Sequence, residues 1–98
     1  MGTFTKTYYK PITGRQVVTA ADASATFAEV MIRSGVINTA PAGVVLNCNV
    51  FASNGTAKTG FKVNFYSFTE SGVVKVENGT SSLVADDVIN LMATFYAV

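Results

Sequence analysis

VINLMATFYAV, Val88 to Val98, is the stretch that decides the fold, and it contains no charged residue, glycine or proline. Every second residue is apolar, a period of two that predicts a β-strand. One face holds Ile89, Leu91, Ala93, Phe95 and Ala97, and the other, only half polar, holds Val88, Asn90, Met92, Thr94 and Tyr96. A strand that is apolar on nearly both faces needs two covers, because an exposed apolar strand promotes aggregation. We therefore expect a central position in a sandwich to supply one cover, and a helix or another subunit to supply the second.

The composition favours a β-rich domain with a weakly charged surface. The chain has 98 residues, which is one domain. Charged residues make up 13% of it, about half the usual share, and twelve Thr, seven Ser and seven Asn fill the gap. Abundant Thr, Val and Phe suit a pleated sheet. Scarce charge leaves little repulsion against association, so we expect a subunit of an assembly.

Three further segments predict strands, with turn residues between them. They are VVLNCNVF (44–51), FKVNFYSF (61–68) and VVKVE (73–77), and the turn signals are Asn54-Gly55, Ser71-Gly72 and Asn78-Gly79. Asparagine and glycine both tolerate the positive φ that tight turns need. The two asparagines also head N-x-T sequons, for which glycosylation is the alternative interpretation. Together with 88–98, these strands predict a mainly β fold, a small antiparallel β-sandwich or barrel.

The first part of the chain is extended. TFTKTYYK (3–10) alternates as a strand or an arm would, Pro11 ends regular pairing, TGR (13–15) predicts a turn and QVVTA (16–20) a short strand. We expect residues 1–15 to form an extended N-terminal arm and residues 16–98 a single β-rich domain.

Residues 20–34 fit either a short helix or a strand. Thr19 and Asp22 have the spacing of a capping box, and Gly35 would end the helix, with Arg33 in its last turn. Against a helix, Thr26, Ala28, Val30 and Ile32 alternate as strand residues do. Both alternatives stay open.

The chain offers little catalytic chemistry. It has no histidine, which excludes nucleophile–histidine catalysis and most zinc sites. Its one cysteine, Cys48, fits a small buried residue, and Asp86-Asp87 fits a turn or strand start better than a cation site. GTAKTG (55–60) lacks the order of residues in a phosphate-binding loop. We expect no enzyme, no cofactor and no metal.

The sequence also predicts neither a signal peptide nor a membrane span. The residues after Met1 lack the apolar core of a signal peptide, and no run of about 20 apolar residues predicts a membrane span. A single cysteine suits folding in a reducing cytosol.

Seven residues are predicted to contact other proteins. Aromatic side chains bury much area at such contacts, and tyrosine does so with little loss of freedom. We expect docking through the arm residues Phe4, Tyr8, Tyr9 and Lys10, and contacts between copies through Tyr66, Met92 and Tyr96. TKTYYK could also meet nucleic acid, but a net charge of +1 argues against that partner.

The arm GTFTKTYYKPITG, the strand pair VVLNCNVFASNG and FKVNFYSF, and the final VINLMATFYAV together resemble small β-rich accessory proteins of tailed-phage virions, in particular those that decorate or cement a capsid shell. The resemblance implies a structural virion protein, made in the host cytoplasm. It also implies that the protein forms trimers or dimers over joints between major capsid subunits. The alternatives are a tail or fibre component, or a sandwich that binds a sugar or small ligand through Asn47, Asn49, Asn64 and Tyr66.

Overall fold

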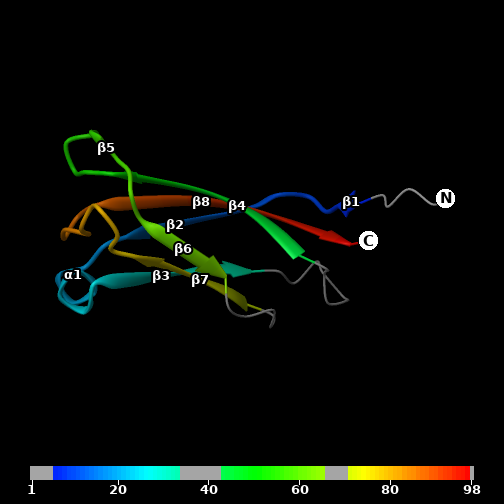
Figure 1. Ribbon diagram of the computed structural model, residues 1–98, viewed down its shortest axis with the longest axis horizontal. Coiled ribbons are helices and arrows are strands. Elements are labelled where there is room, and N and C mark those ends of the chain that lie inside the picture. The colour runs from blue at the N-terminus through cyan, green and yellow to red at the C-terminus, as the bar shows by residue number, and fades with distance from the viewer. Residues whose placement is uncertain (1–5, 34–42, 66–70, 98) are drawn as a thin grey trace.

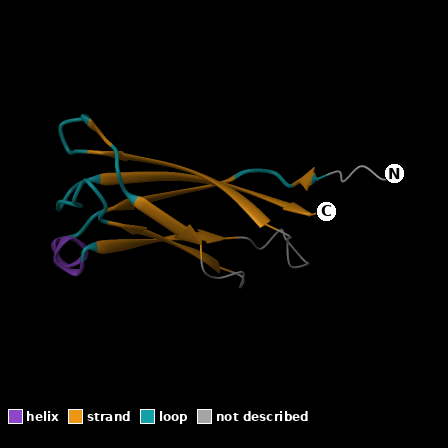
Figure 2. Ribbon diagram, viewed as in Figure 1, coloured by secondary structure: helices purple, strands orange, loops and turns teal. Residues whose placement is uncertain are grey.

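The computed structural model describes residues 6–33, 43–65 and 71–97, which form two antiparallel sheets packed face to face with one short helix at one end (Figures 1 and 2). The sheets do not close into a barrel, so the predicted mainly β fold is confirmed in its sandwich form.

The first sheet, here sheet A, is built around the strand that the sequence singled out. β8 (Val88–Ala97) lies in its middle. One edge of β8 pairs with β1 (Thr7–Tyr8) and β2 (Ile12–Val17), and the other pairs with β4 (Gly43–Phe51), which in turn pairs with β5 (Ala57–Lys58). The predicted central position of this strand is therefore confirmed. Residues 7–8 and 12–15 of the predicted arm run along β8 (Figure 1).

The second sheet, sheet B, has the order β3-β7-β6 in the described residues. β3 spans Phe27–Arg33, β7 spans Ser71–Glu77 and β6 spans Lys62–Phe65. β3 packs against β2 across the sandwich.

The core lies between the inner faces of the two sheets. From β8 it takes Ile89, Leu91, Ala93 and Phe95, which confirms the predicted inner face at those four positions. Opposite them, sheet B contributes every second residue of β3 and β7: Ala28, Val30, Ile32, Val74 and Val76. Full burial of each Val, Ile or Phe side chain contributes about 1.5–3 kcal/mol, so this alternation holds the sheets together.

The ambiguous segment contains both a helix and a strand. α1 (Ala20–Ala25) begins with the predicted capping box, in which Thr19 Oγ1 accepts from the Asp22 amide and Asp22 Oδ2 accepts from the Thr19 amide. The predicted end of the helix at Gly35 was wrong. Thr26 ends it in the left-handed conformation (φ 70°), and the chain continues as β3, because Val30 and Ile32 are buried against the core.

The turn predicted at residues 13–15 was also wrong. Gly14 lies in the middle of β2, paired with Leu91. A Cβ on Gly14 would come within 3.0 Å of Val30 Cγ1, so the glycine allows close approach of β3 rather than a turn.

The Asn54-Gly55 turn is present as predicted. The chain also bends at Asn78-Gly79, but without a positive φ at Gly79, and the turn predicted at Ser71-Gly72 was wrong, because both residues lie in β7 and pair with β3. Gly55 has φ +88°, and Asn54 Oδ1 accepts a hydrogen bond from the Thr56 amide at 3.0 Å. Asn78 Oδ1 accepts from the Leu83 amide at 2.8 Å. Both asparagine side chains therefore stabilise the loops that contain them, which supports the turn interpretation of these sites.

Candidate interaction surfaces on the outer face of sheet A

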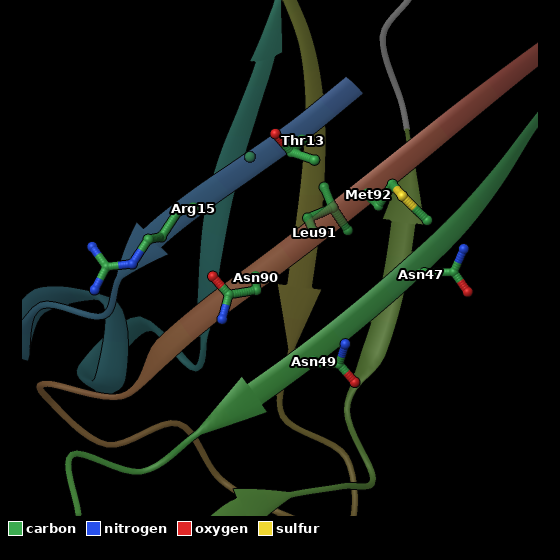
Figure 3. A pocket seen from close by; sticks show the side chains of 8 residues that line it. Thr13, Arg15, Asn47, Asn49, Asn90, Leu91 and Met92 are labelled. Atoms are coloured by element: carbon green, nitrogen blue, oxygen red, sulfur yellow. The ribbon is translucent and has the colours of Figure 1, made fainter. Parts of the chain in front are cut away.

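The outer face of sheet A is defined here by the outward residues of β2, β8 and β4. Strand pairing aligns them in three central rows, each with one residue from β2, one from β8 and one from β4: Thr13–Met92–Asn47, Arg15–Asn90–Asn49 and Val17–Val88–Phe51. Figure 3 shows the first two of these rows, here called the polar rows. The helix does not supply the predicted second cover here, because α1 packs beside β3 and 38% of Met92 is exposed in the single chain.

The two polar rows surround a shallow hollow with a volume of about 560 Å³. Its polar side chains are an arginine, a threonine and three amides: Arg15, Thr13, Asn47, Asn49 and Asn90. All of them are exposed, and none makes a side-chain hydrogen bond within the part of the chain that the structure describes. The hollow therefore offers a set of unused donors and acceptors on a nearly flat surface.

The two sheets differ sharply in the charge of their outer faces. Among the described outward residues of β2, β8 and β4, Arg15 alone is charged. Sheet B instead presents Glu29, Lys62, Lys75 and Glu77. Lys75 Nζ lies 3.8 Å from Glu77 Oε1 and 4.2 Å from the centre of the Phe27 ring, so its charge is partly balanced within the chain. The outer face of sheet A is therefore much less charged than the outer face of sheet B.

A tyrosine cluster, consisting of Lys6, Tyr8 and Tyr96, lies at the far end of the same face. The Tyr8 and Tyr96 ring centres are 5.7 Å apart with planes tilted by 59°, and Lys6 Nζ lies 4.6 Å from the centre of the Tyr96 ring. Gly43 pairs with Tyr96, whose ring and hydroxyl occupy the space that a Cβ on Gly43 would need. Tyr8 is 55% exposed, so the cluster presents an aromatic and basic surface.

The structure brings together some of the predicted contact residues. Tyr8 and Tyr96 touch, and Met92 lies on the same face of β8 as Tyr96. Lys10 is exposed two residues after Tyr8, whereas Tyr9 is half-buried against the core and its amide donates to the Phe95 carbonyl. Phe4 and Tyr66 lie outside the described residues.

The central rows were only partly foreseen from the sequence. Alternation placed Asn47 and Asn49 on one face, but nothing local joins them to Arg15 and Asn90, because the pairing of β2 and β4 with β8 is long-range. The residues grouped for a sugar site are separated: Asn64 pairs with Lys75 on the outer face of sheet B.

The acidic pair Asp86-Asp87 and the thiol of Cys48 lie away from these surfaces. Asp86 is exposed in a turn (φ 74°), whereas Asp87 is buried and pairs with Lys58, so the turn interpretation of the acidic pair is confirmed. Cys48 faces inward from β4, and partial burial raises the pKa of its thiol. No group of three potential metal ligands occurs among residues 6–33, 43–65 and 71–97.

Comparisons with protein-family models, curated proteins and solved structures found no match to this chain. Among the described residues, none of the helical structure has the length and apolar character required to span a bilayer.

Proposed function

We propose that this chain is a structural virion protein that decorates a capsid shell by binding between its major subunits. The observation that carries the proposal is the contrast between the two outer faces. Sheet A presents apolar and amide side chains with Arg15 as the one charge on the described outward residues of β2, β8 and β4, whereas sheet B presents several charged side chains, of which Lys75 and Glu77 form an ion pair. Covering neutral amides with another polypeptide costs less hydration free energy than covering charged groups, provided that the partner hydrogen-bonds the amides.

The mechanism of such a subunit is passive. A protein that binds the assembled shell, but not its dissociated parts, stabilises the shell by mass action. Each contact can be of ordinary size, about 800 Å² per partner, because it is repeated over the lattice.

The tyrosine cluster, with Lys10, is the part of the chain that we assign to shell docking. The cluster lies where β1 pairs with the end of β8, at the end of the sandwich opposite α1 (Figure 1). It can therefore reach a surface that the rest of the domain does not touch. Exposed tyrosine and lysine side chains suit a shell surface with carboxylates and shallow apolar pockets.

Re-decoration of particles tests the docking role. Purified particles that carry this chain are stripped of it and mixed with the wild-type chain or with the Tyr8→Ala, Lys10→Ala double variant. We expect the double variant to stay folded but to lose about tenfold or more in retention, since it removes an exposed aromatic anchor and a charge.

Met31→Ala is the matched control, because Met31 is 62% exposed on the outer face of sheet B. It should re-decorate particles like the wild type. Full occupancy by the double variant would remove the tyrosine cluster from the docking surface, and failure of the wild-type chain to bind any particle would overturn the proposed function.

A second candidate function is suggested by the hollow on sheet A. Three amides, a hydroxyl and a guanidinium around about 560 Å³ could bind a neutral polar ligand such as a sugar. No aromatic ring lines the hollow among the described residues, so stacking on a sugar is not provided there. Saturable binding of an oligosaccharide, lost in Asn90→Ala, would favour this function over shell decoration.

A further inference from the structure

We infer that the outer face of sheet A is a homodimer interface, with a two-fold axis that runs along β8. The inference deepens the proposed function, in which the subunit is present in more than one copy, by naming the face through which copies meet. It rests on how the three central rows would match a second copy of themselves.

The first step is geometric. A two-fold axis along β8, in the plane between two facing sheets, places β2 of each subunit over β4 of the other and keeps every residue in its own row. Thr13 then faces Asn47 of the second copy, Arg15 faces Asn49, and Val17 faces Phe51. The β8 residues Val88, Asn90 and Met92 each face their own equivalents across the axis.

The second step is chemical, since each of these pairings joins compatible groups. Arg15 has only donors and can donate to the side-chain oxygen of Asn49, and the contact occurs twice in a dimer. Asn90 carries both a donor and an acceptor, so two Asn90 amides can pair with each other across the axis. Val17 is 40% exposed in the single chain and would be covered by Phe51 of the second copy.

The third step is the comparison with a two-fold axis at right angles to β8. Such an axis across the strands at the Asn90 row would stack β2 on β2 and bring the two Arg15 guanidinium groups together. Like charges opposed in an interface are costly. With the axis along β8, Arg15 faces an amide, so the charge pattern favours that axis over a crossing at the Asn90 row.

The area fits a weak, reversible contact. The three strands of the rows, β2, β8 and β4, span about 14 Å across, and β8 has ten residues, or about 33 Å of strand. The footprint is therefore at most about 450 Å² per subunit and about 900 Å² in total, the size of a transient contact that dissociates on dilution. Packed sheets cross at about 30°, so the central rows touch and the ends diverge, which leaves the tyrosine cluster free for the shell.

Charge substitutions at Asn49 test the axis, with sedimentation equilibrium of the full chain from low micromolar to near-millimolar concentration. We expect the wild type to form dimers that dissociate on dilution. Asn49→Glu should tighten the dimer about tenfold because it faces Arg15 of the partner, and Asn49→Lys should weaken it by about as much. Asn64→Glu and Asn64→Lys on the outer face of sheet B are the matched controls and should change nothing, and circular dichroism checks the fold of each variant.

The inference is overturned if the wild type is monomeric or trimeric throughout, or if both substitutions at Asn49 shift the equilibrium in the same direction. A monomer that still decorates particles would remove the dimer and leave the proposed function standing. A dimer that responds as expected at Asn49 but decorates no particle would support the dimer and overturn the proposed function.

Discussion

Lys58 and Asp87 show what one pair of residues does for this sandwich. Lys58 Nζ lies 2.6 Å from Asp87 Oδ2 and also donates to the Ser82 carbonyl at 2.7 Å. Asp87 is only 2% exposed, and its Oδ2 accepts a further hydrogen bond from the Val84 amide. The pair therefore joins β5 to the loop that leads into β8. Nothing in the sequence indicates it, because 29 residues separate the partners.

Asp87→Asn should destabilise the fold by about 2 kcal/mol. Breaking a buried ion pair typically costs about 3–5 kcal/mol, and the loss is smaller here because the Lys58 side chain is 20% exposed and keeps part of its hydration. Asp86→Asn is the matched control, since Asp86 is exposed and asparagine tolerates its left-handed conformation. Urea unfolding of both variants measures the difference, and equal midpoints would show that the ion pair contributes nothing.

At the scale of elements, local signals fixed where α1 starts but not where it stops. The capping box at Thr19 and Asp22 was readable because its partners are three residues apart. The helix ends at Thr26, which adopts a left-handed conformation without being glycine, so no sequence signal marks the end. β3 continues from there because Val30 and Ile32 meet residues from distant strands. Likewise, the contact between Tyr8 and Tyr96 depends on the pairing of β1 with β8, which alternation alone does not predict.

Thr19→Ala should cost about 1 kcal/mol in the free energy of unfolding, because it removes the side chain that accepts from the Asp22 amide. Ser24→Ala, at an exposed position within α1, should leave stability unchanged or slightly higher, since alanine favours helix. Chemical denaturation of both variants checks this. A cost at Ser24 that matches the cost at Thr19 would mean that the capping box is not what stabilises α1.

Across the whole molecule, the sandwich is tight in its middle and open along one side. β8 and β7 are flanked by strands on both edges, and they bury the inward residues Ile89, Leu91, Ala93 and Phe95 of β8 and Val74 and Val76 of β7. The inward residues Leu46 and Cys48 of β4, and Val63 of β6, are only partly buried. A hollow of about 200 Å³, lined by Cys48, Phe61 and Val63 among others, lies on this side. Alternation predicted two packed sheets, but which side stays open follows from strand order, which is a long-range property.

Alkylation of Cys48 should report on this open side. Burial raises the pKa of its thiol, so the reactive thiolate is scarcer in the folded chain than in the unfolded one. We expect the folded chain to react more slowly than the chain in urea, and its rate to rise at higher pH than the rate of an ordinary thiol.

The same shift affects stability. Because the folded chain holds this proton more tightly, the contribution of Cys48 to stability is fully present below the pKa of the unfolded thiol and is lost as pH rises through the raised, folded value. Cys48→Ser, which has no thiol, is the control both for the alkylation rate and for the pH dependence of stability. Equal alkylation rates in the folded and unfolded chains would show that the thiol is not shielded.

The position of β8 has a consequence for biosynthesis. β1, β2 and β4 all pair with a strand that is translated after them. While residues 88–97 are still inside the ribosome, the earlier strands of sheet A have no central partner and their apolar faces remain uncovered. Sheet A can therefore assemble only after these residues have left the ribosome. Until then its earlier strands have unpaired edges and uncovered apolar faces, so this is the stage at which the nascent chain is open to aggregation and at which a chaperone would act.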